Sequence, residues 1–104
     1  MNDKQLSNAE LERLRELSDA GSREPWTAMV EGRDHTSGDS FVMIGREGDR
    51  DEDMYVSRDS GPAWAADLDL IAQARTYLPR LLDEIERLRL VAREDHPDEQ
   101  DPQT

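Results

Sequence analysis

The chain has 104 residues, and its 25 acidic and 13 basic side chains give a formal net charge of −12. This length allows one domain, and a content of only 19 Leu, Ile, Val and Phe residues predicts a small hydrophobic core. The absence of cysteine excludes disulfides, thiolate metal sites and a cysteine nucleophile. No segment resembles a secretion signal or a membrane span, so we expect a cytoplasmic protein.

The first predicted element is a helix over residues 8–20. Ser7 and Glu10 have the spacing of a capping box, in which each side chain binds a backbone N–H of the first turn. Leucines then recur every three residues and give the helix one apolar face, and Gly21 is a typical helix end. These leucines are Leu11, Leu14 and Leu17.

Three short apolar runs, separated by segments rich in Gly and Asp, follow between the prolines at positions 25 and 62. They predict strands at 26–30, 41–44 and 54–57, which form a three-stranded antiparallel meander. Such a sheet is too small to be stable alone. We therefore expect helices to cover one of its faces while the other face meets water.

The second helical region covers residues 63–93 and carries an apolar stripe at alternating spacings of three and four. Pro79 lies within this stripe and must either kink one helix or begin another, so we expect helical segments at 63–77 and 79–93 with a kink or a break between them. The stripe serves either oligomerisation or core packing. Its members are Leu78, Leu81, Ile85 and Leu88.

The predicted fold class is therefore α+β: an N-terminal helix, a three-stranded antiparallel meander and a C-terminal helical region. Residues 1–93 form a single domain, and residues 94–104, which contain no aliphatic side chain, form a disordered acidic tail. Trp26 and Trp64 are the largest apolar side chains, so we expect them to anchor opposite ends of the core.

The segment Ala66-Asp67-Leu68-Asp69-Leu70-Ile71-Ala72-Gln73-Ala74-Arg75-Thr76-Tyr77-Leu78-Pro79-Arg80-Leu81-Leu82 resembles a motif of the ead-like early-region proteins of phages and prophages. In that family a leading Leu-x-x-Leu helix is followed by a Pro-Trp motif, here Pro25-Trp26, and by a short β region. The family has no established common activity. The resemblance implies a dispensable accessory protein of a mobile element.

No residue pattern predicts an enzyme. His35 and His96 have no Ser, Asp or second His at a spacing that would build a triad or a zinc site. The Gly-rich segment 45–48 lacks the Lys-Ser/Thr of a nucleotide-binding loop. We therefore expect no catalytic residue, no metal and no cofactor, and the net charge of −12 opposes direct binding of nucleic acid.

Three functions stay open. The first is binding of a host protein with a basic surface, as an acidic inhibitor of a host defence or nucleic-acid enzyme. The second is a structural module that forms a homodimer through the C-terminal helix. The third is a binder of a small ligand at a subunit interface that includes Arg75 and Tyr77. For the first, the partner-binding residues are the acidic side chains of the loops: Asp34, Asp39, Asp49, Asp51, Glu52 and Asp53.

Overall fold

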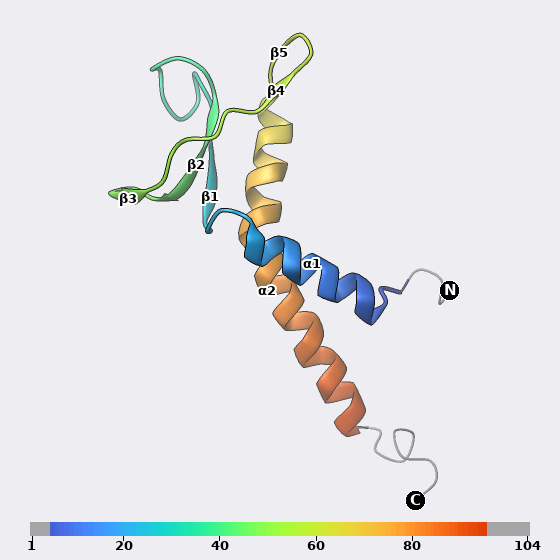
Figure 1. Cartoon of the computed structure of the whole chain (residues 1–104). Helices are drawn as coiled ribbons and strands as arrows, with labels where there is room; N and C mark the ends of the chain where they lie inside the picture. The colour runs from blue at the N-terminus through green and yellow to red at the C-terminus, as the bar shows by residue number, and fades with distance from the viewer. Residues whose placement is uncertain (1–4, 96–104) are drawn as a thin grey trace, which may run out of the picture.

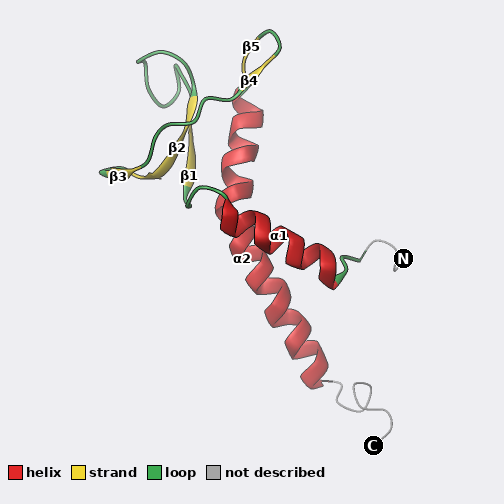
Figure 2. Cartoon of the chain, in the orientation of Figure 1, coloured by secondary structure: helices red, strands yellow, loops and turns green. Residues whose placement is uncertain are grey.

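The computed structural model describes residues 5–95, which form two helices and a three-stranded antiparallel sheet (Figure 1, Figure 2). The predicted α+β fold class is confirmed. In chain order the elements are α1 (Asn8–Ala20), β1 (Trp26–Met29), β2 (Phe41–Arg46), β3 (Asp49–Arg50), β4 (Ser57–Arg58), β5 (Gly61–Pro62) and α2 (Ala65–Asp95).

Helix α1 begins and ends where the sequence predicts. The Ser7 hydroxyl accepts a hydrogen bond from the Glu10 N–H at 3.0 Å, and the Glu10 carboxylate accepts one from the Ser7 N–H at 2.8 Å. The Gly21 N–H donates to the Leu17 carbonyl at the other end. The backbone N–H groups of Ser7 and Glu10 therefore find their partners within the first turn. Because these bonds are local, a short sequence motif suffices to locate the start of this helix.

The three-stranded sheet has the order β1-β2-β3 and is antiparallel throughout. The position of its third strand differs from the prediction, which located it at 54–57. β3 pairs instead at Asp49–Arg50, directly after a tight turn, while Met54 forms only an isolated bridge to Val42. Between these pairings three residues lie opposite two of β2, so a bulge interrupts the strand.

A second, smaller hairpin follows the sheet. Its strands β4 and β5 pair Ser57 with Pro62 and Arg58 with Gly61. The hairpin lies at the N-terminal end of α2 (Figure 1). Ser57, predicted to end a strand of the main sheet, therefore belongs to this separate ribbon.

Helix α2 is continuous from Ala65 to Asp95 and contains Pro79 in its interior. Of the two predicted alternatives, a break at Pro79 is therefore wrong. Contacts on both sides of Pro79 hold the helix in one piece: Thr76 bonds to β1, and Asp83 forms an ion pair with Arg15 of α1. The helix also includes the first two residues, 94–95, of the predicted tail, and the rest of that tail lies outside the described residues.

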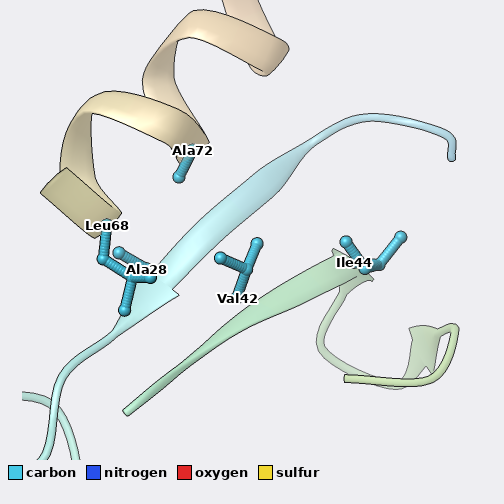
Figure 3. Packing of buried hydrophobic residues seen from close by; sticks show 5 residues of the cluster. All are labelled: Ala28, Val42, Ile44, Leu68 and Ala72. Atoms are coloured by element: carbon cyan, nitrogen blue, oxygen red, sulfur yellow. The ribbon is translucent and has the colours of Figure 1, made fainter. Parts of the chain in front are cut away.

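The core lies between the sheet and the first turns of α2. Figure 3 shows Val42 and Ile44 of β2 and Ala28 of β1 facing Leu68 and Ala72 of α2, and all five side chains are buried. This cluster confirms that helical side chains cover one face of the sheet. It also explains why a chain with few aliphatic residues forms a core, since two strands and two helical turns suffice.

The opposite face of β2 is not open to water, contrary to the prediction. Phe41 and Met43 are also buried. The Phe41 ring lies 5.2 Å from the His35 ring and 5.5 Å from the Tyr55 ring, measured between centroids. β2 is apolar on both faces, so the flanking loops cover the side that α2 does not reach.

The two tryptophans differ in burial. Trp26 is half-buried and packs against the core cluster. Trp64 is 61% exposed, and the Arg58 guanidinium lies 4.4 Å from the centre of its ring. The prediction that Trp64 anchors the core is therefore wrong. Its neighbour Ala63 packs against the core instead, and Trp64 contacts the β4–β5 hairpin.

Arg75 and Thr76 of α2 bind the segment that joins α1 to β1. The Thr76 hydroxyl accepts a hydrogen bond from the Trp26 N–H at 2.9 Å and donates one to the Trp26 carbonyl at 3.0 Å. The Arg75 guanidinium donates to the Ser18 hydroxyl and to the Ser22 carbonyl. These bonds hold the end of α1 and the start of β1 on the same two residues of α2.

Candidate functional site

The histidine of the β1–β2 loop has a structural role. His35 Nε2 lies 3.2 Å from the Met29 carbonyl oxygen, and His35 Nδ1 accepts a hydrogen bond from the Ser37 N–H. Both ring nitrogens therefore hold the loop in shape. His96 lies outside the described residues. Within residues 5–95, no group of His, Asp or Glu side chains has the arrangement needed to hold a metal ion.

Arginines contact most of the acidic loop side chains that were predicted to bind a partner. Arg23 lies 3.1 Å from an Asp51 carboxylate oxygen and 3.5 Å from one of Asp49. Arg50 forms an ion pair with Asp53. The carboxylates of Asp49, Asp51 and Asp53 therefore take part in ion pairs within the β3 region.

The β1–β2 loop contains a second such arrangement. The Asp34 carboxylate accepts a hydrogen bond from the Val30 N–H at 2.8 Å and pairs with Arg33 at 2.9 Å. The hydrogen bond from Arg33 is the largest of the effects that lower the pKa of Asp34. Asp39 and Glu52 are exposed. The six acidic positions thus belong to separate local structures, and their role as a partner-binding surface stays a prediction.

The stripe predicted on the C-terminal helix divides between two faces of α2. Leu78 and Ile85 are half-buried. Leu81 and Leu88 are 57% and 51% exposed. Leu82, next to Leu81 in the sequence, is buried. The members of this set therefore differ in burial, and their role in oligomerisation stays a prediction.

A continuous stripe of exposed apolar side chains follows the outer face of α2. We call this surface the outer stripe, and its members recur at alternating spacings of four and three with one interruption, at Glu84. At 100° per residue, these positions lie opposite the buried side chains of Leu68, Ala72 and Leu82. The outer stripe consists of Leu70, Ala74, Tyr77, Leu81, Leu88 and Val91.

The large side chains of the outer stripe are well exposed. Leu70 is 66% exposed and Tyr77 is 44% exposed, in addition to the two leucines given above. Sequence reasoning missed Leu70, Tyr77 and Val91, although their seven-residue spacing through Glu84 was available as a signal. A contiguous apolar surface of this kind marks a site of interaction more often than it occurs by chance.

Charged side chains flank the outer stripe along one edge. The Arg80 guanidinium lies 4.9 Å from the centre of the Tyr77 ring, and Arg87 donates a 2.6 Å hydrogen bond to Glu84. This bond is the main cause that lowers the pKa of the Glu84 carboxyl. Glu84 and the two arginines therefore form an ordered set of charges beside the apolar surface.

The groove between α1 and the C-terminal part of α2 has a volume of about 550 Å³. Leu11 and Leu90 lie on its walls, and its arginines bind other parts of the two helices. Arg15 pairs with Asp83 and Glu86, and Arg89 donates to the Leu6 carbonyl. These contacts hold the two helices together, so the groove has a structural explanation.

The expected ligand role of Arg75 conflicts with its surroundings. Its guanidinium is committed to Ser18 and Ser22, and only 11% of its side chain is exposed. Tyr77 lies on the outer stripe. A shared pocket built from both side chains therefore has no support in the described residues.

In residues 5–95, neither helix combines the length and the apolar composition needed to cross a membrane. The chain matches no protein-family model, no curated protein and no solved structure, so the resemblance to the ead-like early-region proteins stays a prediction.

Proposed function

We propose that this protein is an oligomerisation module that associates with further copies of itself through the outer stripe of α2. The observation that supports this proposal is the exposure of apolar side chains from Leu70 to Val91, interrupted only at Glu84, on a helix whose opposite face is already packed. Burying about three heptads of such side chains against a matching helix removes a large apolar area from water.

The state of α2 before association also favours this function. Most of the stability of a helix in a protein comes from the packing of one of its faces, because ordering the backbone costs free energy. Here the sheet and α1 already hold α2 in its helical form. Association therefore requires little further ordering, which favours binding through this face. The resemblance to the ead-like early-region proteins implies a phage accessory protein, and we propose that the oligomerisation module serves as one.

A pair of matched variants tests the proposal. Leu88 and Leu90 are 51% and 49% exposed, but Leu88 belongs to the outer stripe whereas Leu90 lines the groove beside α1. We expect Leu88→Glu to convert the oligomer to a monomer, because the variant would bury an unpaired carboxylate between the helices. Leu90→Glu adds the same charge outside the contact and should leave the oligomer intact. Sedimentation velocity across the micromolar range measures both.

The fold must be checked in parallel. Because Leu88 is exposed, Leu88→Glu should retain the wild-type helical circular dichroism. Leu82 is buried, and Leu82→Ala should lower the free energy of unfolding by about 2–5 kcal/mol. A wild-type protein that sediments as a monomer at every concentration would contradict the proposal.

A further inference from the structure

We infer that two copies of α2 pack antiparallel along the outer stripe, with Glu84 of each copy lying beside arginines of the other. This inference rests on the proposed function, because it specifies the partner and its orientation. It follows from the charges on the outer face of the helix.

The first step concerns repulsion between copies. The chain carries a net charge of −12, so two copies repel each other over most of their surfaces. From Ala74 to Val91, the outer stripe and its charged edge contain one acid, Glu84, and two bases, Arg80 and Arg87. This face therefore has a local excess of positive charge. It is the part of α2 where a second copy can approach without meeting an acidic surface.

The second step concerns a parallel pair. In a parallel, aligned pair of helices each stripe position faces its own equivalent. Glu84 would then lie against Glu84 of the second copy inside an apolar contact, and the two carboxylates would repel each other. Arg80 and Arg87 would face Ile85 and Ala92 across the contact, where no acid is available to pair with them. The parallel arrangement therefore adds no attraction between copies to the pairing of Glu84 with Arg87 of its own chain.

The third step concerns the antiparallel pair. Glu84 and Tyr77 occupy equivalent heptad positions, and Arg80 and Arg87 flank them on the same edge. Reversing one helix brings this edge against the same edge of the other. When Leu81 faces Glu84 of the second copy, Arg80 of that copy lies within about 2 Å of Glu84 along the helix axis. Glu84 is then held between Arg87 of its own chain and Arg80 of the other.

Symmetry supports the same arrangement. In this register the two-fold axis passes between Leu82 and Asp83, so the stripe residues from Ala74 to Val91 lie opposite one another inside the contact. The sheets of the two copies then lie towards opposite ends of the dimer. The macrodipoles of the two helices also oppose each other, which is the favourable orientation.

Spin-label distances distinguish the two orientations. The chain has no cysteine, so Gln73→Cys and Ala92→Cys each introduce a single label site beside the stripe. In the antiparallel dimer with Leu81 facing Glu84, equivalent residues are separated along the axis by roughly 28 Å at both positions. In a parallel dimer both pairs lie one helix diameter apart. We expect the same long distance at both sites.

The alternative outcomes separate the inference from the proposed function. Short and equal distances at the two sites would overturn the antiparallel orientation while leaving self-association intact. Absence of any dipolar signal, with a monomer in sedimentation, would overturn both. Distances that persist in the Leu88→Glu background would assign the contact to another surface.

Removal of the Glu84 charge provides an independent test, because it changes the dissociation constant in opposite directions in the two orientations. In the antiparallel dimer Glu84→Gln removes an attraction to Arg80 of the second copy, so the dissociation constant should rise about two- to five-fold. In a parallel dimer the same variant removes a repulsion between two carboxylates, and the dissociation constant should fall. Asp83→Gln is the control, since Asp83 pairs with Arg15 of α1 and lies away from the stripe. A fall with Glu84→Gln contradicts the inference.

Discussion

Gly45 is the residue of the sheet whose backbone most restricts substitution. Its φ is 95°, and a Cβ atom there would lie 2.7 Å from the Asp49 carbonyl oxygen, a distance that real Cβ atoms do not show. We predict that Gly45→Ala lowers the free energy of unfolding by more than the roughly 1–2 kcal/mol that a left-handed conformation alone costs an alanine. Urea denaturation measures this loss.

Gly48 provides the matched control. It also has a positive φ, 87°, but a Cβ atom there would meet nothing within 4 Å. Gly48→Ala should therefore lose only the conformational part of the stability. Equal losses for the two variants would show that the approach of Asp49 to Gly45 contributes nothing.

At the scale of elements, Arg33 joins the β1–β2 loop to α2. Its guanidinium donates two hydrogen bonds to the Asp69 carboxylate, at 2.9 Å and 3.0 Å, and it also pairs with Asp34 of its own loop. The hydrogen bond from Arg33 lowers the pKa of Asp69 below its ordinary value of 3.8. The loop is thereby held against the first turns of the helix.

This clamp predicts an acid-dependent loss of stability. Because the pKa of Asp69 is lower in the folded protein, its ionised form stabilises the fold at neutral pH. That contribution is lost as the pH falls below about 5 and through the folded pKa. We expect Asp69→Asn to be less stable than the wild type at pH 7 and to show a shallower decline in acid. Thermal unfolding between neutral pH and pH 3 measures both slopes. Parallel curves would contradict a role for this pair.

Helix α2 also illustrates how tertiary contacts override a local signal. Proline lacks the N–H of a helical residue and clashes with the preceding turn, so its place within a helix predicts a kink or an end. In this fold, contacts from β1 and α1 stabilise the turns before and after Pro79. Together these contacts offset the cost of the hydrogen bond that Pro79 cannot make. The sequence of α2 alone cannot reveal them, because the partner residues lie in β1 and α1.

At the scale of the whole molecule, the chain is elongated. Its radius of gyration is 19.0 Å, whereas a compact domain of this length has about 13 Å. The sheet packs only against the N-terminal part of α2, and the other end of the helix extends past α1 (Figure 1). A large part of the apolar surface therefore stays outside the core, whereas a compact monomer would bury it.

If the outer stripe is buried by association, stability depends on protein concentration. Binding that occurs only in the folded state shifts unfolding to higher temperature as the concentration rises. We predict a concentration-dependent Tm for the wild type and a constant Tm for Leu88→Glu. Calorimetry over a hundredfold range of concentration checks this. A wild-type Tm that does not change would argue for a stable monomer.

Much of the fold could be predicted because its signals are local. The capping box locates α1, and the apolar runs around Ala28 and Val42 locate the first two strands. The third strand could not be located in this way, since a turn and a bulge decide which residues pair with β2. The exposure of Trp64 could not be predicted either, because it depends on how the β4–β5 hairpin positions the start of α2.

The sequence by itself determined that the C-terminal helix is apolar on more than one side, but not which side is packed. Leu81 and Leu88 belong both to the stripe with Leu78 and Ile85 and to the outer stripe with Leu70 and Tyr77. Periodicity shows only that apolar residues share a face. The tertiary structure decided the outcome, because the sheet and α1 bury the opposite side of α2 and leave Leu81 and Leu88 exposed.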